Sequence, residues 1–390
     1  MSNIMSKKIE SLSLLVCFVL FCCSCNMRTS GKKGDAGKEL KLVKAELGAA
    51  KMDMTSVGDT WEACWASDGT LYLSSDDSKG FNDQPGGNLH FHVLEGENPE
   101  QLVGRTINVM EEYGPMTSKG PDGCMWKASG NTCIDGVVYM FVSRHGLGFF
   151  QEANTLQTAT NSSIIKSTDR GLTWQRSAQE NYDNPMFPGQ RFGSPYFVKY
   201  GKDGVGEVHN ADKYVYAVAN NGFWENGDDM ILGRVLKSKL SNLDASDWQF
   251  YVGGDGMQHE NWSADMENAG QILVNPGKCS MTGVQYIEPL KTYLMIQWYY
   301  PNGAGHAASD ETVWIFYASP TPWGPWSEFD TKRFNPEGYY NPCIVGKFIS
   351  QDGLNLTILT NGDFQTFPLH AQDEKCIYRL TQIPCTLSIE

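Results

Sequence analysis

The chain has 390 residues and a formal net charge of −14, with 40 Gly, 11 Trp and 17 Tyr. This excess of acid leaves no basic face to neutralise phosphates, which excludes nucleic acid as an expected partner. It also disfavours a strongly anionic polysaccharide as substrate. The many glycines and aromatic residues are typical of short strands joined by turns, so we expect an all-β fold.

The first 25 residues have the features of an export signal. Lys7 and Lys8 precede the apolar run LSLLVCFVLFCCSC, which is too short for a comfortable membrane span. The end of this run resembles a lipoprotein signal of the Bacteroidetes kind, with Cys25 as the predicted lipidation site and Cys23 as the alternative. An ordinary signal peptide or an uncleaved anchor is the competing interpretation. Residues 26–39 are small and polar and predict a flexible tether. We therefore expect an exported protein that is lipid-anchored to the outer membrane, on either its periplasmic or its surface side.

Seven cysteines follow the signal, an odd number with irregular spacing. They predict neither a disulfide framework nor a zinc site. Cys124/Cys133 and Cys376/Cys385 are candidate pairs, with buried free thiols as the alternative. No linear motif indicates a cofactor. The sequence neither predicts nor excludes a structural calcium ion.

Residues 40–390 carry a long repeat. Five units each contain an apolar strand, a turn and a second apolar strand, and the second strands centre on Tyr72, Tyr139, Val215, Leu294 and Leu356. Third strands follow in every unit, and fourth strands in the first four. LKLVKAEL at residues 40–47 is expected to supply the missing fourth strand of the last unit. The pattern predicts a five-bladed β-propeller of about four antiparallel strands per blade, as a single monomeric domain over 40–390.

One local motif supports the propeller. STDRGLTW, from Ser167 to Trp174, is the S-x-D-x-G-x-T-W Asp box that sialidases and related propellers carry between the third and fourth strands of a blade. We expect Asp169 to cap this turn and Trp174 to pack between blades, so Asp169 is not a catalytic candidate.

The longest predicted loops all project from one face of the propeller, which is where binding and catalysis usually reside. That face carries acids and aromatic residues from several units. The acids are Asp59, Asp76, Asp77, Glu152, Glu225, Asp228, Asp229, Asp265 and Asp310, and the aromatics are Trp126, Phe149, Trp224, Trp262, Trp298, Tyr299 and Tyr339.

Two carboxyl groups suffice for glycosidic hydrolysis, since one protonates the leaving oxygen and the other activates water or attacks directly. The catalytic candidates are Asp59, Asp77, Asp228 and Asp229. Asp59 directly precedes the first innermost strand, and each Asp pair is expected at the end of a strand near the channel. The predicted substrate contacts are Asp76, Arg144, His145, Glu152, Trp224, Trp298 and Tyr299. Packing between blades is the alternative role for Trp224 and Trp298.

Several stretches resemble a known family. FGSPYFVKYGKD, LGRV and PWGPW occur in the order seen in a bacterial five-bladed β-propeller family, formerly catalogued as a domain of unknown function, that includes endo-D-arabinanases. The resemblance spans roughly residues 57–365. It implies a glycoside hydrolase in which Asp59 and Asp77 match acidic positions of the first blade. Asp228 or Asp229 would match the acid before the LxRV strand. The loop at 143–161 is longer than the family pattern. The resemblance therefore supports the reaction class more strongly than the identity of the substrate.

We therefore predict an endo-acting glycoside hydrolase for a polysaccharide or oligosaccharide, with arabinan as the implied example. A polysaccharide lyase is the first alternative, with His145 or a tyrosine as base and Arg144 neutralising a uronate. A non-catalytic glycan-binding lipoprotein is the second. A sialidase is disfavoured, because only one clear Asp box is present.

Overall fold

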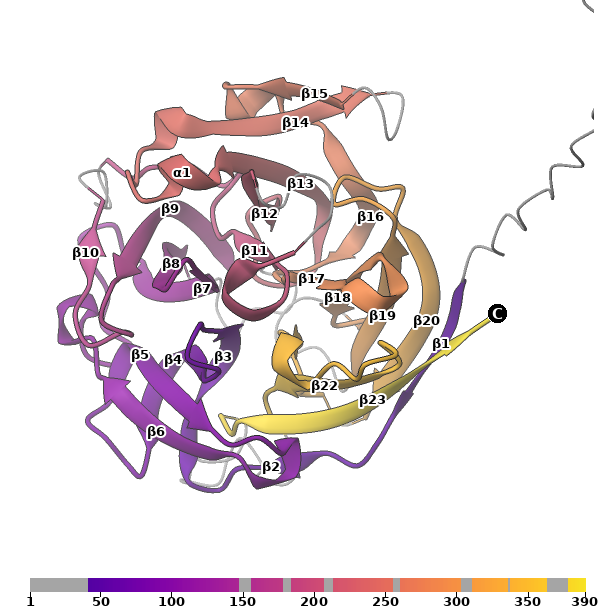
Figure 1. Ribbon diagram of the computed structural model, residues 1–390. Coiled ribbons are helices and arrows are strands. Elements are labelled where there is room, and N and C mark those ends of the chain that lie inside the picture. The colour runs from indigo at the N-terminus through magenta and orange to yellow at the C-terminus, as the bar shows by residue number, and fades with distance from the viewer. Residues whose placement is uncertain are drawn as a thin grey trace, which may run out of the picture. The chain divides into compact units, whose positions relative to one another are not determined.

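The computed structural model describes residues 41–146, 156–177, 184–206, 213–254, 260–302, 311–335, 337–362 and 378–390. The predicted signal and tether lie outside these residues, as do Cys25, Phe149, Glu152, Asp310 and Cys376. The described chain forms five blades around a common axis (Figure 1), which confirms the predicted propeller.

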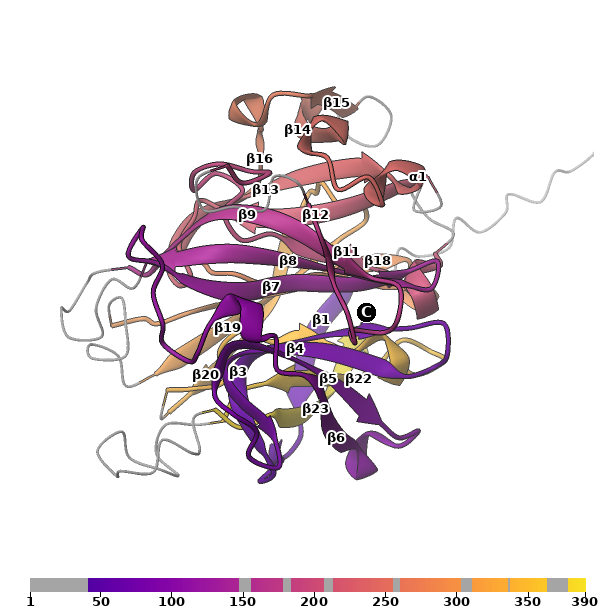
Figure 2. The same cartoon turned by 90° about the vertical axis from the view of Figure 1, so that its left-hand side faces the viewer.

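The first two blades are regular four-stranded antiparallel sheets. Blade 1 contains β3 (Ser56–Trp65), β4 (Leu71–Phe81), β5 (Gly87–Glu95) and β6 (Val103–Asn108). Blade 2 contains β7 (Met125–Ile134), β8 (Val137–Gly146), β9 (Thr158–Ser167) and β10 (Gln175–Arg176). The first strand of each blade lies nearest the axis (Figure 1), and Figure 2 shows β7, β8 and β9 side by side.

Blade 3 is larger than the repeat predicts. It contains β11 (Tyr196–Lys199), β12 (Tyr214–Asn220), β13 (Gly227–Leu236), β14 (Trp248–Gly254), β15 (Glu260–Ser263) and β16 (Gln271–Cys279). The two halves of β13 have different outer partners, because β16 pairs with its first half and β14 with its second. The connection from β14 to blade 4 therefore contains two further strands, β15 and β16.

Blades 4 and 5 complete the ring. Blade 4 contains β17 (Val284–Ile287), β18 (Thr292–Tyr299), β19 (Thr312–Ser319) and β20 (Ser327–Phe334), and β17 pairs in parallel with β11 of blade 3. Blade 5 contains β21 (Cys343–Ile344), β22 (Asn355–Thr360) and β23 (Thr381–Ile389). Its outer strand is β1 (Leu42–Leu47), which lies beside β23 in Figure 1, and β2 (Lys51–Met52) pairs with the other end of β23. The predicted closure by the N-terminal strand is confirmed.

Helical structure is sparse in the described residues. The α-helix α1 spans Lys237–Leu240. Short 3-10 helices span Pro99–Gln101, Glu111–Tyr113, Lys202–Gly204, Ala245–Asp247, Met266–Asn268, Glu288–Leu290 and Gly346–Phe348. No helix in these ranges has the length and apolar character needed to cross a membrane.

The Asp box has the predicted structural role. Asp169 accepts hydrogen bonds from the backbone nitrogen of Thr173 at 2.9 Å and from its hydroxyl at 2.6 Å. The Trp174 ring packs edge-on against Phe91 of blade 1, with centroids 4.9 Å apart. The box therefore fixes a turn and joins two blades.

Cys124 and Cys133 are both free thiols, so the first candidate disulfide pair is not formed. Cys385 is also free and buried.

Candidate active site

A cavity of about 110 Å³ lies where the innermost strands β3 and β7 begin. This is several times the space that one buried water needs. It is lined by Asp59, Thr60, Asp76, Asp77, Thr117, Met125, Lys127, His145, Gln157, Trp224, Tyr340 and Tyr378. The structure thus brings together five of the predicted site residues: Asp59, Asp76, Asp77, His145 and Trp224.

Irregular pairing of β3 and β4 places three carboxyl groups in this cavity. The register between the two strands shifts on both sides of Asp59, whose partner across the ladder is Asp76. Thr60 and Asp77 have φ angles of 48° and 39°. A left-handed backbone at a non-glycine residue costs about 1–3 kcal/mol and persists where the surrounding fold enforces it. These backbone conformations turn the three carboxyl side chains of the two strands toward one cavity.

This geometry corrects the predicted strand ends. Asp76 and Asp77 do not end a strand, since β4 continues to Phe81, and Asp59 lies inside β3 instead of preceding it. The alternation of apolar and polar residues in the sequence does not reveal this bulge. The Ser and Gly residues on both sides of it are as typical of a turn as of a bulged strand.

The three carboxyl groups differ in how many of their oxygens are occupied. Asp76 accepts from the Thr60 hydroxyl at 2.7 Å and from the Ala128 backbone nitrogen at 2.8 Å, one bond to each oxygen. Asp59 accepts one bond at Oδ2, from the Tyr340 hydroxyl at 2.8 Å. Asp77 receives Lys127 Nζ at Oδ2, 2.6 Å away. Within the described residues, Oδ1 of both Asp59 and Asp77 has no hydrogen-bond partner although it is buried.

Burial and charge set the protonation of this cluster. Burial raises the pKa of Asp59 well above its ordinary value, against the lowering effect of the Lys127 ammonium. Burial likewise raises the pKa of Asp76 to about 7. Burial opposes the charge on Lys127, yet Asp77, Asp76 and Asp59 together raise its pKa above the ordinary value. Burial therefore favours the protonated forms of Asp59 and Asp76, which lie beside the ion pair of Lys127 and Asp77.

Aromatic rings form one wall of the cavity. Trp224 is only 4 % exposed, and its ring meets those of Trp298 and Tyr340 edge-on, each with centroids 4.8 Å apart. Trp298 is fully buried behind this wall and donates from its indole nitrogen to the Met281 carbonyl. Trp224 can therefore face a ligand, whereas Trp298 supports it by packing.

His145 lines the cavity as a neutral ring. Burial, with the nearby Lys127 and Arg144 charges, lowers the pKa of His145 to about 3. Its Nε2 lies 3.1 Å from the Ser143 hydroxyl. At neutral pH it can accept or donate a hydrogen bond but carries no charge.

The other predicted residues lie elsewhere. Asp228 accepts from the backbone nitrogen of Gly277 at 2.9 Å, and Asp229 pairs with Arg191 at 3.3 Å and with Gln271. Neither lines the cavity, because β13 is the third strand of its blade and its first half is covered by β16. Arg144 is buried in an ion pair with Asp122, and Tyr299 faces Lys278. Glu152 lies outside the described residues.

Among the cavity residues that the sequence does not single out, Lys127 and Tyr340 contact the two catalytic candidates Asp77 and Asp59. Lys127 belongs to β7, where a lysine in an apolar strand is itself a signal for a buried ion pair. Tyr340 follows Tyr339 in the connection between blades 4 and 5, and the sequence predicts Tyr339 on the site face. Tyr339 has a φ angle of 49°. This backbone conformation reverses the directions in which a regular strand would point the side chains of Tyr339 and Tyr340.

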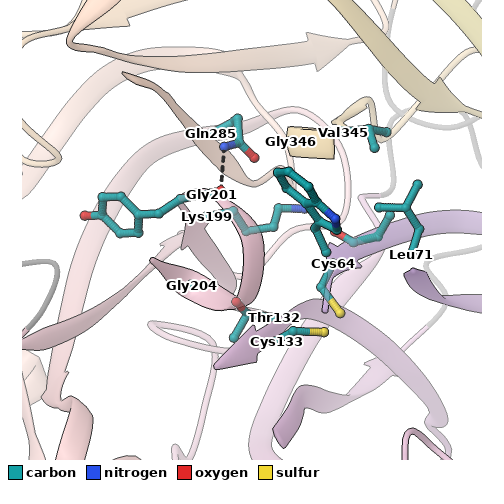
Figure 3. A pocket seen from close by; sticks show the side chains of 13 residues that line it. Cys64, Leu71, Thr132, Cys133, Lys199, Gly201, Gly204, Gln285, Val345 and Gly346 are labelled. Atoms are coloured by element: carbon teal, nitrogen blue, oxygen red, sulfur yellow. Dashed lines mark hydrogen bonds between the residues drawn. The ribbon is translucent and has the colours of Figure 1, made fainter. Parts of the chain in front are cut away.

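A second, smaller cavity of about 20 Å³ lies along the axis, lined in part by Lys199, Gln285, Cys64 and Cys133 (Figure 3). Lys199 pairs there with Glu62 at 2.5 Å and also donates to the Ala63 carbonyl. Lys199, the charged residue that lines this cavity, is therefore already paired with an acid of the protein. Across the described ranges, no group of three or more His, Cys, Asp or Glu side chains is arranged to bind a metal ion.

Three solved structures are similar to this chain. A protein from Bacteroides ovatus, provisionally described as a hydrolase, matches with a TM-score of 0.50 and 17 % identity, over 84 % of this chain and 85 % of that chain. An arabinanase from Bacillus subtilis matches with a TM-score of 0.43 and 10 % identity, over 87 % and 96 %. An endo-arabinase from Bacteroides thetaiotaomicron matches with a TM-score of 0.42 and 10 % identity, over 88 % and 99 %.

No curated protein matches the sequence. A family model does match, over residues 53–367, which include all five predicted residues of the cavity. The match agrees with the family resemblance of the motifs. The chain belongs to the family described as a domain of unknown function, DUF4185.

Proposed function

We propose that the chain is a glycoside hydrolase that cleaves a neutral polysaccharide at this cavity. Asp59 is the general acid that protonates the leaving oxygen, and Asp77 is the base or nucleophile. The observation that carries the proposal is that the three carboxyl groups differ in how many of their oxygens contact a hydrogen-bond donor of the protein. Asp76 has both oxygens engaged within the protein, whereas Asp59 and Asp77 each have one oxygen held and one free.

The two free carboxyl oxygens suit the two tasks of glycoside hydrolysis. A general acid must carry its proton at neutral pH, and burial gives Asp59 a raised pKa. Its partner must be ionised, and Asp77 lies in contact with the Lys127 ammonium. Trp224 supplies an aromatic surface of the kind that packs against the C–H face of a sugar ring.

The charge of the cavity favours a neutral sugar over a uronate. Of the described residues that line it, Lys127 is the one cation, and it is already paired with Asp77. Arg144, which a lyase would need for its uronate, is engaged with Asp122. The family resemblance of the sequence makes an arabinan, cut internally, the first substrate to test.

The test uses purified protein and a panel of neutral and acidic polysaccharides that includes arabinans. New reducing ends without ultraviolet-absorbing products are expected from the active substrate. Asp59→Asn and Asp77→Asn should each lower kcat/KM by about 10³-fold or more while leaving the fold intact. Asp228→Asn is the matched control, because it changes an aspartate outside the cavity, and its activity should stay within about twofold of wild type.

The competing outcomes are distinct. Unsaturated products would indicate a lyase, and saturable oligosaccharide binding without turnover would indicate a binding protein. Full activity in both Asp59→Asn and Asp77→Asn would overturn the assignment.

A further inference from the structure

One hydrogen bond joins the proposed general acid to a distant part of the chain. The Tyr340 hydroxyl donates to Asp59 Oδ2 at 2.8 Å, and both side chains are buried. Asp59 belongs to blade 1, whereas Tyr340 lies just before β21 of blade 5. The bond therefore spans the junction of the first and last blades.

The backbone around both partners is held in an unusual conformation. Thr60, directly after Asp59, has a φ of 48°, and Tyr339 and Asn341, on either side of Tyr340, have φ values of 49° and 52°. The Tyr340 carbonyl accepts from the Thr360 hydroxyl at 2.7 Å and from the Asn361 amide at 3.0 Å. Non-glycine residues keep such angles only where the fold enforces them. The orientation of the tyrosine is thus set by β22 and the residue after it.

We propose that Tyr340 is the positioning residue of the general acid: by donating to Asp59 Oδ2, it confines the acidic proton to Oδ1 and aims it into the cavity. A protonated carboxyl has one O–H donor and one carbonyl oxygen. With the tyrosine donating to Oδ2, that oxygen is the carbonyl, and the proton resides on Oδ1. Oδ1 is buried and makes no hydrogen bond within the described residues. The inference rests on the proposed function and deepens it.

Tyr340 also limits how strongly Asp59 retains its proton. A hydrogen bond donated to a carboxylate stabilises the charged form, so the tyrosine lowers the pKa that burial raises. Other groups act on Asp59 as well. The titratable and charged groups that share its cavity or act on it electrostatically are Asp76, Asp77, Lys127, His145, Tyr300, Tyr340 and Tyr378.

The first test needs no substrate. Infrared difference spectra of the full chain are recorded across a pH titration, and the C=O stretching band of protonated Asp59 is identified by its loss in Asp59→Asn. In Tyr340→Phe, this band should move to higher frequency, because its oxygen loses a hydrogen bond. Its titration midpoint should rise by about one pH unit. An unchanged band and midpoint would overturn the inference.

Tyr286→Phe is the matched control. Tyr286 is as buried as Tyr340, but its hydroxyl has no hydrogen-bond partner within the described residues. Its loss should leave the Asp59 band unchanged. If both tyrosine variants shift the band equally, the effect is a general one of loosened packing, and Tyr340 has no positioning role.

The second test separates this inference from the proposed function. A general acid loses activity as pH rises through its pKa, so the basic limb of the kcat profile in Tyr340→Phe should move upward by the shift measured in the infrared. Full activity of Asp59→Asn would sink the general-acid role that the proposed function gives to this residue. Inactive Asp59→Asn combined with an unmoved basic limb in Tyr340→Phe would sink the positioning role alone.

Discussion

Lys127 balances the charge of the carboxyl cluster, and its removal should be costly. Its side chain is 6 % exposed and lies 2.6 Å from Asp77. Lys127→Met leaves Asp77, whose side chain is only 18 % exposed, without its partner, so we expect a loss of about 3 kcal/mol in the free energy of unfolding at pH 7. Urea denaturation measures it. Lys166→Met, which removes a half-buried lysine whose bond to the Ser241 carbonyl is exposed to solvent, should cost less than about 1 kcal/mol. Equal losses in the two variants would contradict the prediction.

His90 should make blade 1 sensitive to acid. Burial lowers the pKa of this fully buried ring to about 4, from about 6.5 in the unfolded chain. Between these pH values the unfolded state binds more protons, so stability falls as pH falls. The wild type should lose up to about 3 kcal/mol more than His90→Gln between pH 7 and pH 4. Urea midpoints of both proteins at the two pH values give this difference, and parallel losses would refute it.

At the residue scale, the acids of the cavity could be predicted from the sequence, whereas the residues that contact these acids could not. Asp59, Asp76 and Asp77 could be predicted, because acids are conspicuous beside an apolar strand. Tyr340 could not, since the left-handed backbone at Tyr339 and Asn341 breaks the alternation from which side-chain directions are inferred. The sequence predicts Asp228 near the channel, but β16 covers that part of β13.

At the element scale, Lys199 joins strands of three blades at the axis. From β11 it donates to Glu62 and the Ala63 carbonyl of β3 and contacts the Cys343 sulfur of β21 at 3.3 Å. Lys199→Met leaves Glu62 buried and unpaired, so we expect a loss of about 3–5 kcal/mol in the free energy of unfolding. The double variant Glu62→Leu/Lys199→Met should recover most of it. Denaturant unfolding measures both, and a double variant no more stable than Lys199→Met would contradict the assignment.

The repeat could be predicted well because each blade needs the same buried strands. The second strands centred on Tyr72, Tyr139, Val215, Leu294 and Leu356 all exist, as β4, β8, β12, β18 and β22. β16 escaped prediction for a physical reason. Its burial alternates only weakly, and Pro276 and Gly277 interrupt its strand pattern.

At the scale of the whole molecule, closure of the ring depends on β1. The strand pairs with β23 of blade 5, and the Ala45 backbone nitrogen donates to Asp330 of blade 4 at 2.7 Å. Deleting residues 1–48 should lower the free energy of unfolding by about 3 kcal/mol or more, because Leu42 and Ala45 lose their burial and β23 becomes an open edge prone to aggregation. Deleting only residues 1–40 retains every one of these contacts and should leave the unfolding midpoint unchanged. Calorimetry and light scattering on both truncations decide the matter: if they unfold at the same temperature, β1 is an accessory to the ring and not its closure.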